Sequence, residues 1–539
     1  MQYMKFLFLL IFLLLFHDGG ELIGFKELSS RYAVVSSSDD NECTIMVISG
    51  TATTDGRPIL WKNRDVIDPD HRYLYIKSVE YDGHNTYGFT GNFYASDSSR
   101  CYMGVNETGF AIINANCYNL TDNRTNGIDD GDLMRLALEW CDSVEEWEAL
   151  LRMSGLFGRR DCWMFGVIDA SGAAKLYECD NENYVVYDAN NSTDAPYGYL
   201  LRSVFGMSAE PIEEGQVRYF RAKYLVENYT RNYLLDPKYI LQQIATDISL
   251  SCEYYTHIND PYPLPFYGSQ GGLPVGFAKT RETINRYKTR SCSVIRGVLP
   301  NENPLLATTY AVIGQPTLSL AVPLWVGAEY VPYCLRGEEQ APWYLLVAQR
   351  MLDLYPLDTE DREWAINTLY LLDSLKTGVH SWSLELERWG IRQAEIELNN
   401  WRMRDFDPFE IRRAEIEISN ILWNGFVNEC VPEQVSIDDE PEALPRGFKA
   451  YNYPNPFNLK TIIKFDLPKA TELSQVDVNI YALTGERVTS LKVTEYKDGK
   501  GSATWDGKNK AGVSVSSGIY FYSIEIPGIS KRGKMLLIK

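Results

Sequence analysis

The alternation of hydrophobic and polar positions predicts a mixture of strands and helices. Apolar residues alternate or run together over Thr44–Gly50 and Pro58–Lys62, and the Asp55-Gly56 turn between them predicts a β-hairpin. YMGVNETGFAIIN, residues 102–114, predicts two short strands around an Asn-Glu-Thr-Gly turn. Further strands are predicted over Cys162–Asp169, Ala174–Glu178, Tyr310–Gly314 and Thr317–Val326.

Helical spacing appears in two regions. Leucine and tryptophan positions predict a helix over Gly131–Leu151. Residues 341–430 hold two similar segments, IRQAEIELNN at 391–400 and IRRAEIEISN at 411–420, which predict two amphipathic helices packed on the main body. Two copies are too few for a solenoid, and packing can be their only role. Hairpins and helices without repeated βαβ units predict an α+β fold.

The first forty residues indicate export. Lys5 precedes the apolar run Phe6–Phe16, which is too short to span a bilayer comfortably. We predict a signal peptide over residues 1–20 and a polar pro-segment over residues 21–42, which ends in SSSDDNE. A retained N-terminal anchor is the alternative.

Length and charge divide the rest of the chain. A chain of 539 residues is expected to form two or three domains. The formal net charge of −20 argues against a nucleic-acid partner. The charge is uneven, because residues 449–539 hold 14 Lys and Arg against 8 Asp and Glu and contain no cysteine. We therefore predict a linker over residues 431–448, which is polar and contains proline.

The ten cysteines leave their pairing open. Disulfides are permitted in an exported protein, but spacing does not reveal which cysteines pair. If one cysteine is a nucleophile, nine remain, so at least one further thiol is expected to be free. No CxxC motif or His/Cys cluster indicates a metal, and we expect no metal and no cofactor.

Cys43, which follows the pro-segment, is the candidate nucleophile. A thiol has a reference pKa of about 8.5 and needs a base to react at neutral pH. Cleavage between Glu42 and Cys43 would create an α-amino group with a pKa of about 7.7–8 beside the sulfur. This would explain the pro-segment and the absence of a nearby histidine. The alternative is that Cys43 is one buried cysteine among ten.

The sequence that begins at Cys43, CTIMVISGTATTDGRPILWKNRD, resembles the mature start of the N-terminal-nucleophile amide hydrolases. That group includes choloylglycine hydrolases, penicillin V acylases and acyl-CoA:6-aminopenicillanate acyltransferases. The resemblance continues in GVNETGFAIINAN at 104–116, GQVRYFRAKYL at 215–225 and the strand-rich residues 291–328. It is greatest for the penicillin acyltransferase-like branch.

The resemblance implies a four-layer αββα catalytic domain over residues 43–335, with a helical extension over residues 336–430. It also implies roles for four residues. Cys43 would attack the amide carbonyl, with its own α-amine as the base. Asp65 would orient that amine. Asn116 would help to form the oxyanion hole. Arg218 would favour the thiolate form of Cys43.

A structural ion pair is the alternative role for Asp65 and Arg218. Two positions depart from the family pattern. In GYLLRSVFG, Val204 stands where relatives carry an asparagine that serves as a second oxyanion donor, and a valine side chain cannot donate. Lys62 stands where some relatives carry arginine, so the charge remains but the bidentate fork is lost.

The last ninety residues predict a separate small domain. Strands that alternate with Gly/Asn turns, beginning with YPNPFNLKTIIKFDLPK at Tyr453, predict an immunoglobulin-like sandwich over residues 449–539. The series closely resembles the C-terminal sorting domain of the type IX secretion system. The resemblance implies that this machinery is a partner, that the protein is secreted or displayed at the cell surface, and that it meets a membrane only through export or attachment. A generic immunoglobulin-like module, as in flagellar hook-cap proteins, is the alternative.

Together these features predict a secreted enzyme that processes itself between Glu42 and Cys43. A small or non-peptide amide would acylate Cys43 and release its amine, and water or a second amine would take the acyl group from the thioester. A cysteine N-terminal dipeptidase of the same fold is one alternative. A catalytically inactive surface binding protein, which Val204 suggests, is another, and thioester trapping at Cys43 separates it from an enzyme.

Overall fold

The computed structural model covers most of the chain in separate stretches. It describes residues 42–66, 70–81, 83–121, 126–249, 276–355, 365–371, 378–429, 449–455, 457–466, 476–482, 487–497, 500–526 and 529–538. The predicted signal peptide, the linker and all of the pro-segment except Glu42 lie outside these residues. None of the helices in the described stretches is long and apolar enough to cross a membrane.

The predicted hairpin after Cys43 forms the centre of a six-stranded antiparallel sheet. Strand β1 (Thr44–Ile48) pairs with β2 (Ile59–Asp65), so the hairpin prediction is confirmed. The strand order is β12-β1-β2-β14-β15-β16. The other four strands are β12 (Tyr199–Arg202), β14 (Thr289–Arg296), β15 (Thr308–Ile313) and β16 (Val322–Trp325).

The predicted first residue of one strand in this sheet was wrong. The range Thr317–Val326 was expected to be a strand throughout, but β16 begins only at Val322. The segment Pro316–Leu318 forms a 3-10 turn instead. Pro316 has no N–H for a ladder and a φ angle suited to the first position of a helical turn, which explains the difference.

The second sheet has seven strands in the order β11-β10-β9-β8-β7-β6-β3. The predicted pairs around the Asn-Glu-Thr-Gly turn (β7 with β8) and across residues 162–178 (β9 with β10) are confirmed. The strands are β3 (His71–Ile76), β6 (Phe89–Tyr94), β7 (Met103–Asn106), β8 (Ala111–Asn116), β9 (Trp163–Ile168), β10 (Ala174–Cys179) and β11 (Tyr184–Asp188).

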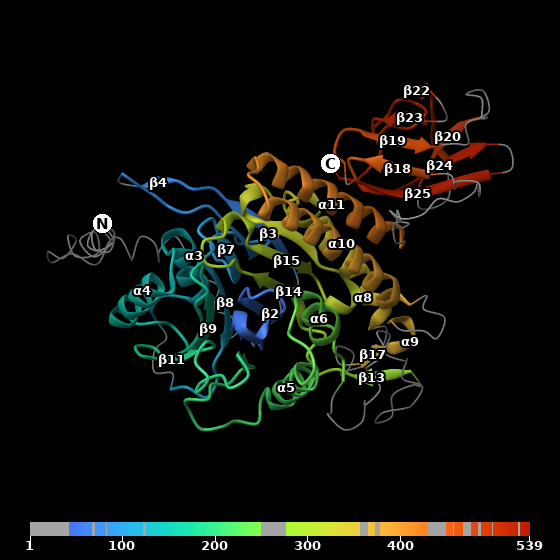
Figure 1. Cartoon of the computed structure of the whole chain (residues 1–539). Coiled ribbons are helices and arrows are strands. Elements are labelled where there is room, and N and C mark those ends of the chain that lie inside the picture. The colour runs from blue at the N-terminus through green and yellow to red at the C-terminus, as the bar shows by residue number, and fades with distance from the viewer. Residues whose placement is uncertain are drawn as a thin grey trace.

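The two sheets pack against each other through a shared apolar core (Figure 1). At Gly166 of β9, a Cβ atom would lie 2.7 Å from a methyl group of Val47 of β1, so the missing side chain permits close approach of the sheets. Helices α3 (Asp130–Trp140) and α4 (Val144–Phe157) form a second core with the seven-stranded sheet, where Trp147 stacks edge-to-face on Phe165. The mixed α and β prediction is therefore confirmed.

The single helix predicted over Gly131–Leu151 is in fact these two helices. The break falls at Cys141, where the backbone is extended, and Ser143 is the extended N-cap of α4. The amide of Val144 donates to Oδ2 of Asp169, 2.9 Å away. Leucine and tryptophan spacing continues across the break, so the periodicity alone did not reveal it.

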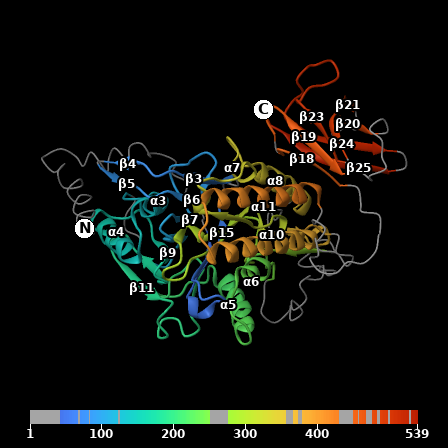
Figure 2. The same ribbon diagram turned by 45° about the horizontal axis from the view of Figure 1, so that its top comes forward.

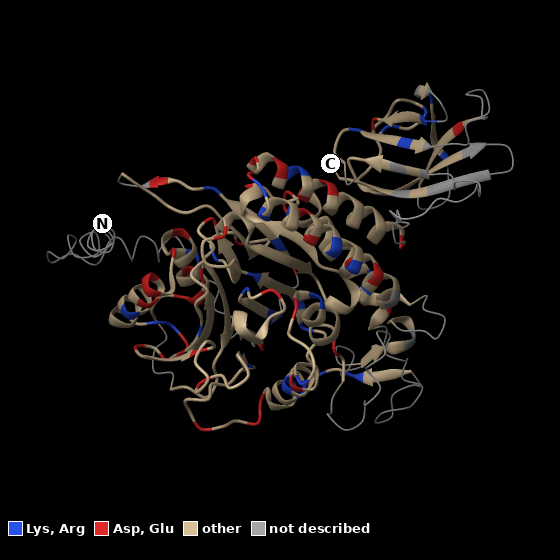
Figure 3. Ribbon diagram, viewed as in Figure 1, with Lys and Arg blue, Asp and Glu red and all other residues tan. Residues whose placement is uncertain are grey.

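The two predicted amphipathic helices are confirmed as α10 (Val379–Arg402) and α11 (Pro408–Asn428), which lie side by side (Figure 2). They pack beside β16, and charged residues are spread along their length (Figure 3). Two buried carboxylates fix them: Glu387 accepts from the amide of Ala321 at 2.7 Å, and Glu415 accepts from the amide of Trp325 at 2.8 Å. Their apolar faces thus complete the core behind the six-stranded sheet.

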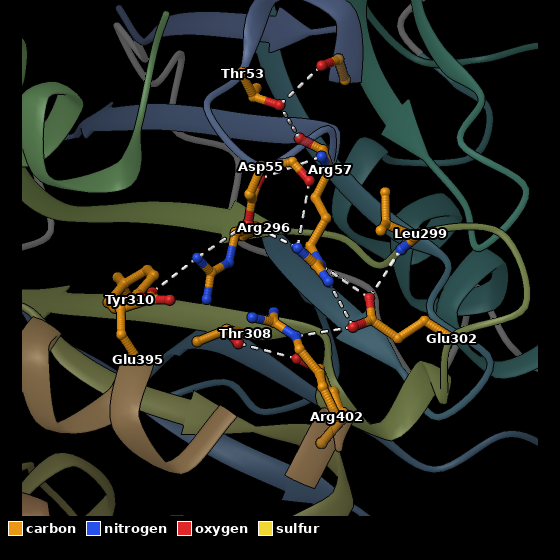
Figure 4. A network of polar contacts seen from close by, with 12 residues as sticks. Thr53, Asp55, Arg57, Arg296, Leu299, Glu302, Thr308, Tyr310, Glu395 and Arg402 are labelled. Carbon is orange, nitrogen blue, oxygen red and sulfur yellow. Dashed lines mark hydrogen bonds and ion pairs between the residues drawn. The ribbon is translucent and has the colours of Figure 1, made fainter. Parts of the chain in front are cut away.

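A partly buried ionic network joins the turn of the β1–β2 hairpin to α10 (Figure 4). Arg57 contacts Glu302 at 2.6 Å and Asp55 at 3.0 Å, and Arg402 of α10 contacts the same Glu302 at 2.8 Å. Arg296 of β14 contacts Asp55 at 3.4 Å and Glu395 of α10 at 2.7 Å. Three arginines therefore meet three carboxylates, and this balance anchors the hairpin whose other end carries Cys43.

The C-terminal domain consists of two four-stranded antiparallel sheets in the orders β18-β19-β23-β22 and β21-β20-β24-β25. Trp505, Ile480 and Ile463 are fully buried between them. The strands are β18 (Lys449–Tyr453), β19 (Thr461–Asp466), β20 (Asp477–Ala482), β21 (Arg487–Leu491), β22 (Val493–Lys497), β23 (Lys500–Trp505), β24 (Gly518–Ile526) and β25 (Ile529–Leu537).

The remaining elements are short except for α5 and α8. The helices are α5 (Gln216–Thr230), α6 (Pro237–Tyr239), α7 (Tyr333–Arg336), α8 (Pro342–Leu354) and α9 (Thr368–Leu371), and a π-helical turn follows α6 over Ile240–Ile244. The minor strand pairs are β4 (Glu80–Tyr81) with β5 (His84–Asn85) and β13 (Phe277–Lys279) with β17 (Ala365–Asn367).

Candidate active site

Cys43 lies buried at the start of β1, with 3% of its surface exposed. The preceding residue, Glu42, extends the antiparallel ladder, because its amide donates to the carbonyl oxygen of Asp65 at 3.1 Å. The peptide bond between Glu42 and Cys43 is therefore held beside the end of β2. Asp65, one of the predicted site residues, is brought beside Glu42, the residue before the candidate nucleophile, in this way.

The Asp65 carboxylate is fully buried and has strong partners for both oxygens. Its Oδ2 accepts from Nε of Arg286 at 2.7 Å, and its Oδ1 accepts from Oγ1 of Thr289 at 2.7 Å. Burial alone would lower the pKa of Arg286, but the carboxylates of Asp65 and Glu42 raise it above its ordinary value. Arg286 is therefore a permanent cation at this place.

The Glu42 side chain occupies a cluster of cations. Its Oε2 lies 2.7 Å from Nη2 of Arg286 and 3.1 Å from Nη2 of Arg218, and its Oε1 lies 3.9 Å from Nζ of Lys288. Burial raises the pKa of Glu42, but the charges of Arg286 and Arg218 outweigh burial and hold it below its usual range. Arg218 also lies 3.5 Å from Glu282, a more exposed carboxylate. The predicted residues Asp65 and Arg218 thus meet through Glu42 and Arg286.

Sequence reasoning missed Arg286. It lies in the loop before β14, within the ordinary-looking stretch NRYKTR, where no motif singles it out. Besides its two carboxylates, its Nη2 lies 3.5 Å from the carbonyl oxygen of Glu42, which belongs to the peptide bond before Cys43. The only available signal was a basic residue just before a predicted strand.

Lys62, noted in the sequence only as a departure, is fully buried. Its ammonium donates to the carbonyl oxygen of Tyr102 at 3.1 Å and to Oδ1 of Asn114, whose amide donates to Asp130. Burial lowers the pKa of Lys62 to about 8, while electrostatic interaction with the neighbouring Cys43 and Asp130 opposes that shift. Lys62 is therefore a further cationic side chain close to the candidate nucleophile.

Arg64 is another buried cation near Cys43. Its guanidinium carbon lies 3.6 Å from the ring centroid of Tyr102 and 4.6 Å from that of Tyr94, a cation–π arrangement. Its Nε and Nη2 make no hydrogen bond with any other described residue. Buried donors without partners are costly, so this region favours negative charge.

Asn116, the predicted oxyanion donor, lies at the end of β8 opposite Trp163 of β9. It is partly exposed, and no side-chain hydrogen bond ties its amide to another residue in the described stretches. It makes no hydrogen bond with Cys43 in those stretches either. Its amide is therefore free to donate, and its role in the oxyanion hole stays a prediction.

Val204 lies just beyond β12, which pairs with β1. Ile45 is opposite Arg202, so extending this register by two residues would bring Val204 beside Cys43. The Val204 side chain is fully buried, and its carbonyl oxygen accepts from the amide of Tyr118. The adjacent Ser203 hydroxyl is buried and lacks a hydrogen-bond partner among the described residues. Ser203 therefore brings a buried, unused hydroxyl donor to this strand end.

None of the cysteines that the structure describes forms a disulfide. The disulfides that an exported protein could form are absent among these eight: Cys43, Cys101, Cys117, Cys141, Cys162, Cys179, Cys292 and Cys334. Burial raises the pKa of Cys101 and Cys334 to about 12, so these are inert core thiols. Within the described residues, no group of three or more His, Cys, Asp or Glu side chains is placed to hold a metal ion.

Two family models match parts of the chain. Residues 51–194 match the acyl-coenzyme A:6-aminopenicillanic acid acyl-transferase family, and residues 456–527 match the FlgD Ig-like domain. The first match begins after Cys43, ends before Arg218 and covers less than half of the chain. It supports a fold like that of the N-terminal-nucleophile amide hydrolases and acyltransferases for the two-sheet part. No curated protein matches the chain.

Solved structures resemble the chain only distantly. Penicillin V acylase from Agrobacterium tumefaciens is 14% identical, covering 52% of this chain and 86% of that chain, with a TM-score of 0.29. A mutant conjugated bile acid hydrolase from Clostridium perfringens is 13% identical, covering 52% and 92% of the two chains, with a TM-score of 0.30. Latent PorU from Porphyromonas gingivalis is 25% identical over 18% of this chain and 10% of that chain, with a TM-score of 0.15.

Proposed function

We propose that the protein is a secreted, self-processing amide hydrolase or acyltransferase with a four-layer αββα catalytic domain over residues 43–335. The observation that carries the proposal is the peptide bond between Glu42 and Cys43. Its carbonyl lies next to a guanidinium group, and its cysteine lies at the start of a buried strand. The family match over residues 51–194 supports the same class of reaction.

Self-processing needs only groups of this chain and one water molecule. The Cys43 sulfur attacks the carbonyl carbon of Glu42, the C–N bond breaks, and the proton lost by the thiol goes to the departing nitrogen. The resulting thioester joins Glu42 to the sulfur, and water then hydrolyses it. The products are a chain that begins with the free amine of Cys43 and a pro-segment that ends in the Glu42 carboxylate. Arg286, 3.5 Å from the carbonyl oxygen, is placed to stabilise the oxyanion.

Turnover repeats this chemistry on a small amide substrate. The new α-amine takes the proton from the Cys43 thiol and later gives a proton to the leaving amine. The buried Asp65 holds the cation Arg286 at the site and lies beside the position of that amine. Asn116 supplies an amide donor for the oxyanion, and Arg218 adds positive charge. A second amine in place of water would make the reaction a transfer.

Val204 favours a second candidate function, a surface binding protein without catalytic activity. A valine at the position of an expected donor removes one stabilising interaction for the oxyanion. The two functions differ in whether Cys43 becomes acylated.

Acylation of Cys43 is the test between them. The processed protein is mixed with the p-nitrophenyl ester of a short acid, quenched in acid and analysed by mass spectrometry of its peptides. The enzyme is expected to carry one acyl group on Cys43, Cys43→Ala none, and the matched control Cys334→Ala the same as the wild type. A processed wild-type chain that stays unmodified would support the binding function instead.

We further propose that residues 449–539 direct export by a type IX secretion system. The sequence motifs from Tyr453 onward support this, and the FlgD Ig-like match is compatible with the predicted sandwich. In a host with that machinery, removal of residues 449–539 should retain the protein inside the cell, whereas secretion of the shortened chain would contradict the proposal.

A further inference from the structure

We propose that the mature enzyme prefers amides whose acyl group ends in a carboxylate, of the glutaryl type. This inference rests on the self-processing proposed above. The acyl-side pocket would be the cation cluster that Glu42 fills before cleavage, formed by Arg218, Arg286 and Lys288.

The cluster is a built site that already holds a carboxylate. Arg218 comes from α5, whereas Arg286 and Lys288 come from the loop before β14, so two distant parts of the chain converge on one side chain. The side chain of Arg218 is fully buried and that of Arg286 is 1% exposed. The Glu42 carboxylate itself is almost entirely covered, with 11% of the side chain exposed. Cations this deeply buried need an anionic partner.

The chemistry of the occupant identifies the substrate class. In the bond that is cleaved, Glu42 is the acyl part and Cys43 supplies the nitrogen. From the Glu42 carbonyl carbon, the chain runs through Cα, Cβ and Cγ to the carboxylate, which is the carbon skeleton of a glutaryl group. An acyl group of this length places its carboxylate on the cations while its carbonyl lies beside the Cys43 sulfur.

Processing removes this anion and leaves the cations in place. Asp65 still pairs with Arg286, and Glu282 still lies 3.5 Å from Arg218. Three cations of the cluster then face one carboxylate fewer than before. The mature site therefore attracts a new carboxylate at the place that Glu42 has left.

The test compares two p-nitroanilides that differ only at the end of the acyl chain. One carries a glutaryl group and the other carries its neutral isostere, the 4-carbamoylbutanoyl group. The expected kcat/KM is about ten- to hundredfold higher for the glutaryl compound, as charge-assisted hydrogen bonds suggest. Lys288→Gln should reduce this ratio, whereas Lys223→Gln, a partly exposed lysine on α5, should not change it.

Binding is measured separately, in a chain that begins at residue 43 and carries Cys43→Ala. Glutarate should raise the melting temperature of this chain, and glutaramide should not. Equal cleavage of both anilides, or faster cleavage of the neutral one, would overturn the preference while leaving amide hydrolysis intact. A different result would be that neither anilide is cleaved and the ester probe does not acylate Cys43. That result would overturn both the proposed hydrolase and this inference, whether or not glutarate binds.

Discussion

The buried pair of Asp65 and Arg286 gives the sharpest energetic prediction, through the substitution Asp65→Asn. Asn keeps the shape of the side chain but removes the charge that Nε of Arg286 contacts at 2.7 Å. Both side chains are at most 1% exposed, so solvent screens the pair very little. In the unprocessed chain Arg286 keeps one carboxylate, that of Glu42, also at 2.7 Å.

The cost of the substitution should therefore depend on processing. A buried ion pair that loses one partner usually costs about 3–5 kcal/mol, because the other charge is left uncompensated. We expect that cost in a mature chain beginning at Cys43, where Glu42 is absent. In the unprocessed background Cys43→Ala, Arg286 still has Glu42, and we expect about 1.5–3 kcal/mol, the contribution of a hydrogen bond to a charged group.

The assay is urea unfolding at pH 7.5, followed by fluorescence, since eleven of the twelve tryptophans precede residue 449. Glu227→Gln is the matched control, because it breaks a partly exposed ion pair with Lys223 on α5 and should change the free energy of unfolding by less than about 0.5 kcal/mol. An equal cost of Asp65→Asn in both backgrounds, or a cost below about 1 kcal/mol in the mature chain, would refute the assignment of Glu42 and Asp65 as joint partners of Arg286.

Three further predictions concern single side chains. Asn116→Ala should lower kcat about a hundredfold, the loss of one oxyanion donor of roughly 3 kcal/mol, without a change in melting temperature; an unchanged kcat would exclude Asn116 from the oxyanion hole. Lys62 loses its proton near its pKa of about 8, so Cys43 acylation in the wild type should decline above that pH relative to Lys62→Arg, which stays charged; parallel pH profiles would show that the ammonium has no part in the reaction. Burial raises the pKa of Glu387 from 4.5 to about 7, so the folded state binds more protons than the unfolded state between these values, and stability should fall by roughly 3 kcal/mol as pH rises through that window. Urea unfolding at pH 5 and pH 8 should show that Glu387→Gln lacks this part of the slope, and an identical slope would contradict the shifted pKa.

Much of the fold could be predicted from the sequence because its signals are local. The hairpin turn at Asp55-Gly56 and the alternating strands around it depend on neighbouring residues alone. The amphipathic helices α10 and α11 were equally visible, because their apolar positions repeat with helical spacing. The break between α3 and α4 could not be seen in the sequence, because it depends on an N-cap and on a hydrogen bond from Val144 to the distant Asp169.

The residues of the candidate site could likewise be predicted only in part. Cys43, Asp65 and Arg218 were predicted because they belong to quoted motifs, and the structure brings Asp65 and Arg218 to the residue that precedes Cys43. Arg286 was missed because its partners are more than two hundred residues away in sequence, and no local pattern records such a contact. The burial of Lys62 was also hidden, because a lysine on an alternating strand is ordinarily expected to face solvent.

The most direct test of the account is the N-terminal sequence and intact mass of the purified full-length protein beside a Cys43→Ala variant. The wild-type chain should begin at Cys43, and the variant should keep Glu42 and the residues before it. A wild-type chain that retains Glu42 would leave Cys43 without its α-amine and would contradict the proposed self-processing amide chemistry.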